Sequence, residues 1–481
     1  MEFCRRWGIA PEVRRLSIAE DFPRNVLFVT AANGYEIARF EYPSRGEAIL
    51  VHSPEYLQRC SQFLFDPLLR RTATSFDCVD LRYQTELLDF IQDDSGVTAH
   101  LETNEGRTPF SIKARYLIGC DGADSFVRQK LGIPLLGNMA LSQSMNIYFE
   151  SDDIAAVLPR SKAIMQWLID EGGYWGGIVS VDGERKWRLG LRNRKAEQTL
   201  SIQDAARLIR KAVGRDFEFR VISSLNWTRR SVVADRYRQG RVFLAGDAAH
   251  QLSPTGGFGM NTGIADAIDI SWKLAAVVEG WGGPGLLASY DEERRPIGQM
   301  AVREGENNFN TLASIPSGPE VAQESDAGAS LRRKIGDFIY TNGFEQEYES
   351  DGVIFGYHYE GSPVVCTETG DPTPTTIKRY IPSSRPGHRA PHIWLNDSQS
   401  TLDLFGRGFV LLCSAGTDPQ PLCDAARERS VPLQAVRIDI PNISQLYERR
   451  MTLVRPDGHV AWRGDSAPVN AGQLLDQVRG T

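Results

Sequence analysis

The order of apolar and polar positions divides the chain into segments of different period. Consecutive apolar residues at 116–118 and 242–245 indicate short strands that are buried on both faces. The segment from about 261 to 280 is apolar around much of its circumference, with Ile264 and Ile268 one turn apart, which predicts a long buried helix. Buried strands followed by a buried helix are typical of an α/β domain.

Between residues 140 and 235 the pattern changes to period two, with aromatic and β-branched residues at the apolar positions. This pattern is typical of half-buried antiparallel strands. One face of such a sheet could cover a flat aromatic molecule, although the core of the sheet is the commoner place for any one aromatic residue. The candidate substrate-binding residues are Tyr148, Trp167, Tyr174, Trp175 and Trp187, and the glycines at 172, 173, 176 and 177 predict space beside them.

The remaining chain is charged and helical in pattern, then rich in proline and threonine, and then alternates again. The last part follows the order strand, helix, strand, strand, with a Pro-Asp-Gly turn signal at 456–458. The predicted parts are an α/β domain at 1–139 with 236–290, a sheet domain at 140–235, a helical region at 291–360, a linker at 361–385 and a C-terminal domain at 386–481.

Composition narrows the class of protein. The 481 residues include 41% hydrophobic and 24% charged residues, which is ordinary for a chain of two or three globular domains. The net charge of −7 argues against nucleic acid or an anionic membrane as a partner. Seven cysteines without framework spacing favour a reducing compartment, so we expect a cytoplasmic location. No Cys/His spacing suggests a metal site.

The segment 241–263 contains the strongest candidates for ligand binding. Asp247 follows the apolar run directly, at the carboxyl end of a strand, where open α/β sheets bind ligands. The turn from Pro254 to Gly259 is rich in glycine, which lets backbone N–H groups approach a ligand closely. The helix predicted to start near Asn261 would add unpaired N–H donors and partial positive charge.

This string resembles the second flavin motif of the FAD-dependent aromatic hydroxylases, the group with the p-hydroxybenzoate hydroxylase fold. The resemblance implies that Asp247 binds the ribitol or ribose region of FAD and that Pro254 lies beside the reactive edge of the isoalloxazine. It also implies that the backbone amides of Met260 and Asn261 hold the flavin pyrimidine carbonyls.

Two other segments are similar to motifs of the same family. Asp121-Gly122 resembles the Asp-Gly motif near the FAD pyrophosphate, and Gln62 stands where the family places a flavin contact, although a solvated position at a helix start explains Gln62 equally well. The cofactor-binding residues that the resemblance implies are Gln62, Asp121, Gly122, Gly246, Asp247, Pro254, Gly257, Gly259, Met260 and Asn261.

The C-terminal part is similar to the thioredoxin-like tail of the phenol hydroxylase branch. Cys413 and Cys423 do not form a C-x-x-C pair, so we expect the tail to pack against the protein or to stabilise a homodimer rather than to act in redox chemistry. The implied fold class is α/β, α+β overall: a three-layer nucleotide-binding domain, an antiparallel sheet domain for the substrate and a thioredoxin-like C-terminal domain.

The beginning of the chain departs from the family pattern. The family opens with a strand, a G-x-G-x-x-G turn and a helix that cradle the pyrophosphate, and no such motif occurs early in this sequence. Two explanations remain. We expect that the functional protein has further residues upstream; the alternative is a degenerate, non-catalytic homologue that acts as an interaction protein.

The resemblance implies a specific reaction. NADPH or NADH reduces FAD, O2 adds at the flavin C4a, and the resulting hydroperoxide transfers one oxygen to a phenolic or polyketide-type aromatic ring. The flavin-dependent halogenases, which are similar around the Gly-Asp motif, carry a W-x-W-x-I-P signature that this chain lacks. The sequence assigns no catalytic base, because His250 beside the Gly-Asp motif is better explained by a structural role.

Overall fold

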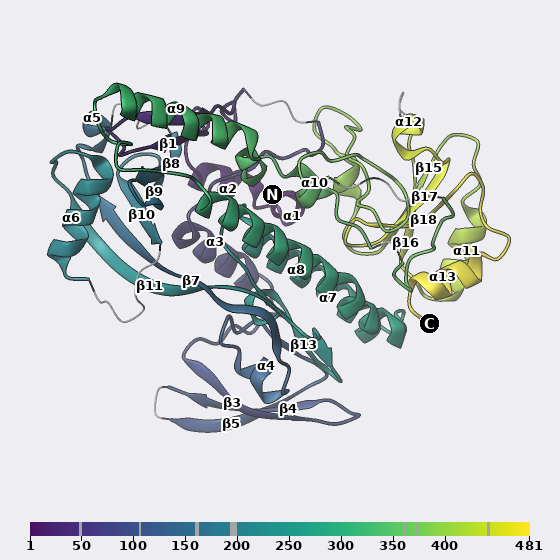
Figure 1. The fold of residues 1–481 in the computed structure, drawn as a ribbon. Helices are drawn as coiled ribbons and strands as arrows, with labels where there is room; N and C mark the ends of the chain where they lie inside the picture. The colour runs from purple at the N-terminus through teal and green to yellow at the C-terminus, as the bar shows by residue number, and fades with distance from the viewer. Residues whose placement is uncertain are drawn as a thin grey trace. The chain divides into compact units, whose positions relative to one another are not determined.

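A computed structural model describes residues 1–47, 51–104, 107–158, 163–192, 200–359, 361–370, 374, 376–439 and 443–481 (Figure 1). These residues form two compact units, each assembled from three segments of the chain. The first unit contains Met1–Ser75, Asn138–Ser231 and Glu306–Tyr348, and the second contains Phe76–Gly137, Val232–Gly305 and Glu349–Thr481.

The first unit is built on a twisted sheet of mainly antiparallel strands, as the period-two pattern predicts. Its strand order is β11-β7-β10-β9-β8-β1-β2, and β1 pairs in parallel with β8. The strands are β1 (Asn25–Val29), β2 (Glu36–Phe40), β7 (Leu135–Glu150), β8 (Ala163–Asp170), β9 (Gly173–Ser180), β10 (Lys186–Arg192) and β11 (Arg220–Ala234).

Helices cover both faces of this sheet. On one face α6 (Ile202–Val213) packs on Leu189 and Leu191 of β10, and on the other α9 (Asp326–Thr341) packs on Phe28 and Val26 of β1. The helices α1 (Glu2–Arg6), α2 (Ala10–Leu16), α3 (Gln62–Thr74) and α5 (Ile154–Val157) and the 3-10 turn η2 (Phe344–Glu347) complete the unit.

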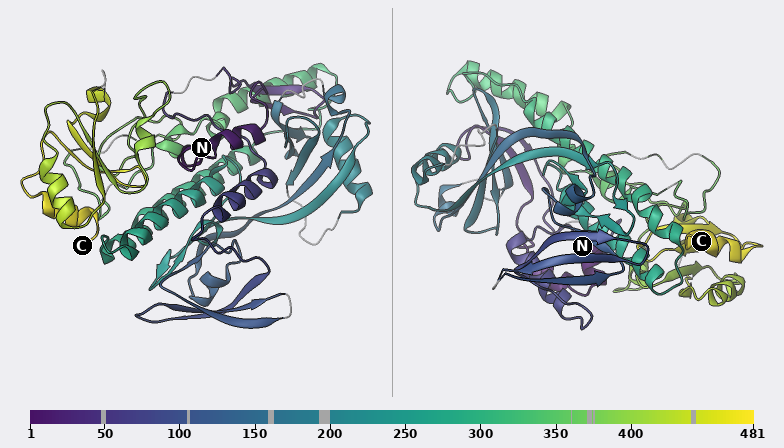
Figure 2. Two further views of the ribbon diagram at one scale, coloured as in Figure 1. Left: turned by 180° about the vertical axis from the view of Figure 1, so that it is seen from behind. Right: turned by 90° about the horizontal axis from the view of Figure 1, so that it is seen from below.

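The second unit contains the two predicted buried strands. They are β6 (Leu117–Gly119) and β13 (Val242–Leu244), which pair in parallel in a sheet with β12 (Arg238–Gln239). The prediction of burial is confirmed for β13 but wrong for β6, in which Ile118 is exposed. A second sheet contains the antiparallel strands β3 (Thr85–Gln92), β4 (Val97–Thr103) and β5 (Thr108–Ala114), and it lies beside α4 (Phe126–Lys130). The apolar contact between Phe90 and Phe126 joins them. Figure 2 shows this three-stranded sheet from two further sides.

Two long helices run through this part of the chain. The predicted buried helix is α7 (Phe258–Val278), which begins three residues before the expected Asn261, and α8 (Pro284–Ala313) follows it. The short elements η1 (Gly246–Ala248) and β14 (His250–Gln251) connect β13 to α7, and β14 pairs with Val232 and Val233 at the end of β11.

The C-terminal part has the predicted thioredoxin-like order of elements. The sheet order is β16-β15-β17-β18, with β15 and β16 parallel and the other pairs antiparallel. Its elements are α10 (Asp351–Phe355), η3 (Thr401–Leu404), β15 (Phe409–Cys413), α11 (Gln420–Glu428), β16 (Leu433–Arg437), α12 (Ile443–Tyr447), β17 (Met451–Val454), β18 (Val460–Gly464) and α13 (Ala471–Val478). Cys413 and Cys423 are both free thiols.

This thioredoxin-like part is packed against α7 rather than tethered beside it. Trp272 and Ala276 of α7 share one apolar core with Phe409 of β15 and Leu475 of α13. Of the predicted linker 361–385, residues 371–373 and 375 lie outside the described residues, and Val364 and Val365 are buried. In the part of the chain that the structure describes, no helix is both long and apolar enough to cross a membrane.

Candidate active site

The two acidic motifs lie at one edge of the second unit's parallel sheet. Leu244 of β13 is opposite Gly119 of β6, so Asp247 and Asp121 both follow the carboxyl ends of neighbouring parallel strands. Ligands bind at this edge in open α/β sheets. Arg128 ties the two motifs together, because its guanidinium donates to the carbonyls of Ala123 and Ala248, both at 3.2 Å.

The two carboxylates are used differently. Asp121 accepts hydrogen bonds from Ser125 Oγ at 2.6 Å and from the Val127 backbone N–H at 2.9 Å, so it caps the start of α4. Asp247 is exposed, and its carboxylate has no hydrogen bond or ion pair to any described residue. Asp247 is therefore the carboxylate that remains available to a ligand, while Gly122, at φ +79°, shapes the turn beside Asp121.

Glycine brings the Gly-Asp turn close to the helix behind it. Gly246 has φ +61°, a conformation that favours glycine. A Cβ atom on Gly263 of α7 would lie 3.1 Å from the Gly246 Cα, so the turn and the helix meet backbone to backbone. The Gly246 N–H donates to Asp266 Oδ2 at 3.1 Å, which fixes the turn that carries Asp247.

The start of α7 is open and uncapped. Gly257 occupies the cap position with φ +69°, no side chain caps the helix, and a Cβ atom there would meet nothing within 4 Å. Met260 is 56% exposed, and exposed Asn261 donates from Nδ2 to the Gly257 carbonyl at 2.8 Å. The first N–H groups of a helix lack intrahelical partners and carry partial positive charge, so this end favours an electron-rich group.

The remaining cofactor candidates are less strongly constrained. Exposed Pro254 accepts from the Gly257 N–H at 3.1 Å and opens the turn, whereas a Cβ atom on Gly259 would make only ordinary contact with Leu252. Exposed Gln62 begins α3 in the first unit, and its role as a flavin contact stays a prediction.

The five substrate candidates divide between the two faces of the sheet. Trp175 and Trp187 face α6: Trp187 is 2% exposed in that core, and Lys211 lies 4.4 Å from the Trp175 ring. Trp167 and Tyr174 pack together on the α9 face with ring centroids 5.3 Å apart. A bulge between Leu168 and Ile169 breaks the register opposite β9, so period two alone does not give the facing of Tyr174 and Trp175.

Tyr148 lies on the same face as Trp167. Its neighbours Ile147 and Phe149 point into the α6 core, and its own ring meets Phe63 of α3 at 6.1 Å. The Trp167 indole donates to the Tyr348 hydroxyl at 2.6 Å. Gly176 and Gly177 do not mark the expected open space, because a Cβ atom on Gly177 would lie 2.6 Å from the Trp167 ring and one on Gly176 would meet the Gly190 carbonyl. A Cβ atom on Gly172 would make only ordinary contact with Asp170.

The structure also reveals a buried network of charges that sequence analysis did not identify. Asp266 of α7 accepts from the Gly246 N–H through Oδ2, which is also 2.7 Å from His250 Nε2, and from Arg294 Nε through Oδ1 at 2.8 Å. Arg294 in turn donates to the Tyr359 hydroxyl at 2.9 Å. His250 is fully buried in this network, which supports its expected structural role.

A second part of the network joins α7 and α8 to the C-terminal domain. Arg455 donates to both carboxylate oxygens of Glu293, at 2.6 and 2.8 Å, and to Asp457 at 2.6 Å. Lys273 of α7 lies 2.6 Å from Glu293 and 2.7 Å from Asp269. The spacing of Asp266, Asp269 and Lys273 along one face of an apolar helix is the signal that could have revealed this network.

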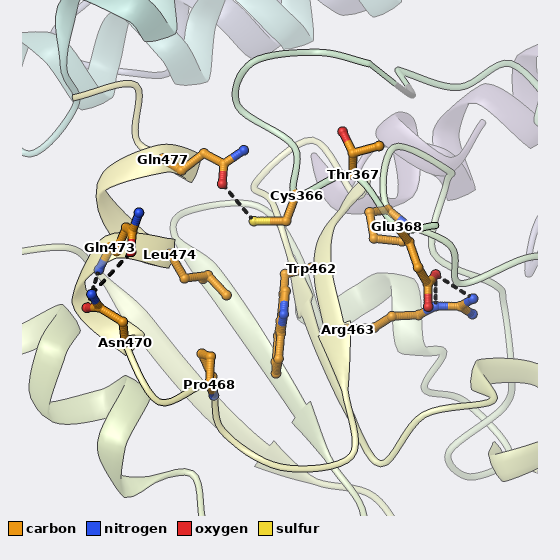
Figure 3. Close-up of a pocket in the computed structure, with 11 residues that line it drawn as sticks. Cys366, Thr367, Glu368, Trp462, Arg463, Pro468, Asn470, Gln473, Leu474 and Gln477 are labelled. Atoms are coloured by element: carbon orange, nitrogen blue, oxygen red, sulfur yellow. Dashed lines mark hydrogen bonds and ion pairs between the residues drawn. The ribbon is translucent and has the colours of Figure 1, made fainter. Parts of the chain in front are cut away.

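The C-terminal domain holds a separate pocket of about 390 Å³, which Figure 3 shows around Trp462. Its polar side chains already satisfy one another: Cys366 donates to Gln477, Asn470 to Gln473 and Arg463 to Glu368. None of the candidate flavin or substrate residues lines it. Among the described residues no group of three or more metal-ligating side chains occurs.

Comparison with known proteins agrees with this geometry. A family model for the FAD binding domain matches residues 1–305, and one for the C-terminal part of aromatic-ring hydroxylases matches residues 383–480. A putative polyketide hydroxylase of Streptomyces halstedii is 32% identical over 517 residues, which cover 100% of this chain and 87% of that protein.

Two solved structures have the same fold. RebC, soaked with chromopyrrolic acid and containing 7-carboxy-K252c, is 38% identical with a TM-score of 0.93, covering 100% of this chain and 90% of RebC. The flavin-dependent monooxygenase PieE, in complex with FAD and substrate, is 29% identical with a TM-score of 0.90, covering 99% of this chain and 90% of PieE. The expected fold class is confirmed, and this chain belongs to the FAD-dependent aromatic-ring hydroxylases.

Proposed function

We propose that this chain binds FAD at Asp247 and the open start of α7 and uses NAD(P)H and O2 to hydroxylate a multi-ring phenolic or polyketide-type aromatic substrate. The observation that carries the proposal is an exposed carboxylate without a protein partner beside an uncapped, glycine-lined helix start. A ribityl or ribose hydroxyl fits the carboxylate, and the pyrimidine carbonyls fit the helix N–H groups.

Bound FAD would supply the redox chemistry, namely acceptance of hydride and activation of O2 for insertion of one oxygen atom into the ring. The chain's own residues bind and orient. Asp266 holds the Gly246 turn, the backbone amides of Met260 and Asn261 would face the electron-rich edge of the cofactor, and Pro254 presents no N–H donor. Tyr148, Trp167 and Tyr174 would cover the aromatic ring and exclude water from it.

The relatives support the multi-ring substrate class, because one is described as a putative polyketide hydroxylase and RebC was solved with 7-carboxy-K252c. His250 is not proposed as a catalytic base, because it is fully buried beside Asp266.

The proposal is tested first by flavin binding. Asp247→Asn should weaken FAD binding about tenfold, since a hydrogen bond to a charged acceptor contributes about 1.5–3 kcal/mol. The control is Asp94→Asn, which alters an exposed carboxylate elsewhere in the second unit. Wild type should then oxidise NAD(P)H faster with an aromatic substrate and yield a product one oxygen atom heavier. A chain that binds no FAD, or equal affinity in the two variants, would contradict the site.

A further inference from the structure

Four arginines lie on or against one face of the first unit's sheet, and we name them the arginine face: Arg59, Arg188, Arg192 and Arg229. Leu189 and Leu191 of β10 point into the α6 core, so Arg188 and Arg192, which alternate with them, project from the opposite face. Tyr148, directly opposite Arg188 in the strand register, shares this face. The arginines therefore accompany the aromatic side chains proposed to cover the substrate.

These guanidinium groups are partly or fully removed from water. Arg229 is only 8% exposed, and the other three are half-buried. The Nε atoms of Arg188 and Arg192 are buried and have no hydrogen-bond acceptor among the described residues. Buried polar groups in native proteins are almost always hydrogen-bonded, so these two donors require a physical explanation.

Like charges gather on the arginine face. Burial first, and then the Arg188 charge, lowers the pKa of Arg59 to about 10, and Arg24 acts in the same direction. Burial is also the main reason that the pKa of Arg229 falls to about 10, with Arg192 and Arg188 contributing. The Glu347 carboxylate acts in the opposite direction on the pKa of both arginines.

Aromatic rings hold the cations in place. The Arg229 guanidinium carbon lies 4.8 Å from the Trp227 ring and 4.7 Å from the Phe309 ring, and the Arg192 guanidinium carbon is 5.2 Å from Phe309. Such contacts stabilise a cation and fix its plane, but they supply no hydrogen-bond acceptor. Arg229 also donates to Ser144 Oγ at 3.5 Å, whereas the buried Nε atoms of Arg188 and Arg192 are left for an acceptor from outside the described residues.

The strand also leaves room between two of the arginines. Gly190 separates Arg188 from Arg192 on β10, and a Cβ atom there would meet nothing closer than Asn146 Oδ1 at 3.5 Å. A planar group can therefore approach the backbone between the two side chains.

We propose that the arginine face binds a carboxylate on the substrate, so that the enzyme acts on aromatic acids. Guanidinium groups pair with carboxylates through two parallel hydrogen bonds, and retaining several buried cations is costly unless a ligand neutralises them. The inference rests on the proposed function for the identity of the aromatic substrate, but its test is equilibrium binding and requires no turnover.

The experiment compares three planar acids with their neutral carboxamides: benzoate, 2-naphthoate and anthracene-2-carboxylate. Binding is measured by quenching of tryptophan fluorescence. At least one acid should bind about tenfold more tightly than its amide, a preference that corresponds to about 1.4 kcal/mol. Arg188→Met and Arg229→Met should each reduce this preference to about one, with the amide affinity unchanged.

The matched control is Arg220→Met, which removes an arginine of the same strand as Arg229 that is exposed and paired with Glu150 at 2.6 Å. It should keep the preference for the acid. Equal binding of every acid and its amide, no binding of any acid, or the same loss in Arg220→Met would overturn the proposal.

A third measurement separates a nucleotide phosphate from a substrate carboxylate. If Arg188→Met raises the KM for NADPH while the preference for the acid persists, the arginines serve the nucleotide and the proposal is wrong. A chain that prefers the acids but fails to bind FAD would contradict the proposed function and leave the arginine face intact, so the two failures are distinguishable.

Discussion

The protein contains two clusters of buried charge that are treated in opposite ways. In the second unit, four carboxylates (Asp266, Asp269, Glu293 and Asp457) are interleaved with three cations (Lys273, Arg294 and Arg455) at hydrogen-bonding distance. In the first unit, the four cations of the arginine face lie near one another, and the buried Nε atoms of Arg188 and Arg192 have no hydrogen-bond acceptor among the described residues. We name the interleaved charges of the second unit the paired cluster. We infer that the paired cluster stabilises the fold, whereas the arginine face is completed by a ligand.

The largest expected effect tests the paired cluster. Arg455→Met leaves Glu293 and Asp457 buried beside an apolar side chain, and breaking a buried ion pair costs about 3–5 kcal/mol. The free energy of unfolding, measured by urea titration, should fall by this amount. An unchanged value would mean that the network does not stabilise the second unit.

The paired cluster should also respond to pH. Burial is the main cause that raises the pKa of Asp269 to about 7, and the cluster has one carboxylate more than it has lysine and arginine cations. Because the folded state keeps a proton that the unfolded state releases, Asp269 lowers stability as pH rises from about 4 to about 7, by up to about 1.4 kcal/mol per pH unit.

Asp269→Asn should remove this contribution. The pH profile of its unfolding free energy, subtracted from that of wild type, isolates Asp269 from the lowered pKa of His459, which burial produces nearby. Parallel profiles between pH 4 and 7 would mean that Asp269 is ionised in the folded protein throughout this range, and would contradict the predicted pH dependence.

Alanine substitutions at two glycines of the first unit should distinguish an effect on core packing from an effect on ligand binding. Gly177→Ala should destabilise the protein by about 1–3 kcal/mol, because its Cβ atom would lie 2.6 Å from the Trp167 ring. Gly190→Ala meets no close neighbour and should leave stability within about 0.5 kcal/mol while weakening acid binding. Thermal unfolding measures the stability of each variant, and titration with the aromatic acids measures its binding. Similar destabilisation by Gly177→Ala and Gly190→Ala would contradict the inferred space between Arg188 and Arg192.

A further effect, smaller than that of Arg455→Met, has the opposite sign. Arg188→Met removes a partly buried cation from like-charged neighbours and should raise the free energy of unfolding by about 1 kcal/mol, in contrast to Arg455→Met. A loss of stability comparable to that of Arg455→Met would show that Arg188 has a structural partner and that the two clusters do not differ.

Local signals explain what the sequence could predict. The Gly-Asp turn, the strand before it and the apolar helix after it depend on neighbouring residues, and the thioredoxin-like order of the tail follows from alternating segments and one hairpin turn. The helix start was placed three residues late because Gly257, in a left-handed conformation, caps α7 by backbone shape rather than by a side chain that a pattern reveals.

Long-range packing explains the rest. On β10 the arginines alternate with leucines, which is typical of a solvated strand face, but residues distant in the chain, such as Phe309, lie against that face. The bulge opposite β9 changes which side chains share a face, so Tyr174 and Trp175 could not be assigned from period two. The ion network likewise joins residues far apart in the chain, such as Glu293 and Arg455.

The interleaving of the two units has a consequence for how this protein is made. The polypeptide crosses from one unit to the other five times, so neither unit corresponds to a continuous stretch of the gene. During synthesis, α9 can cover the sheet of the first unit only after well over half of the message has been translated. Asp266 likewise gains its partner Arg294, and Arg294 gains Tyr359, only when those later residues have been made. A nascent chain interrupted before that point would expose apolar surface, which makes it a natural client for chaperones.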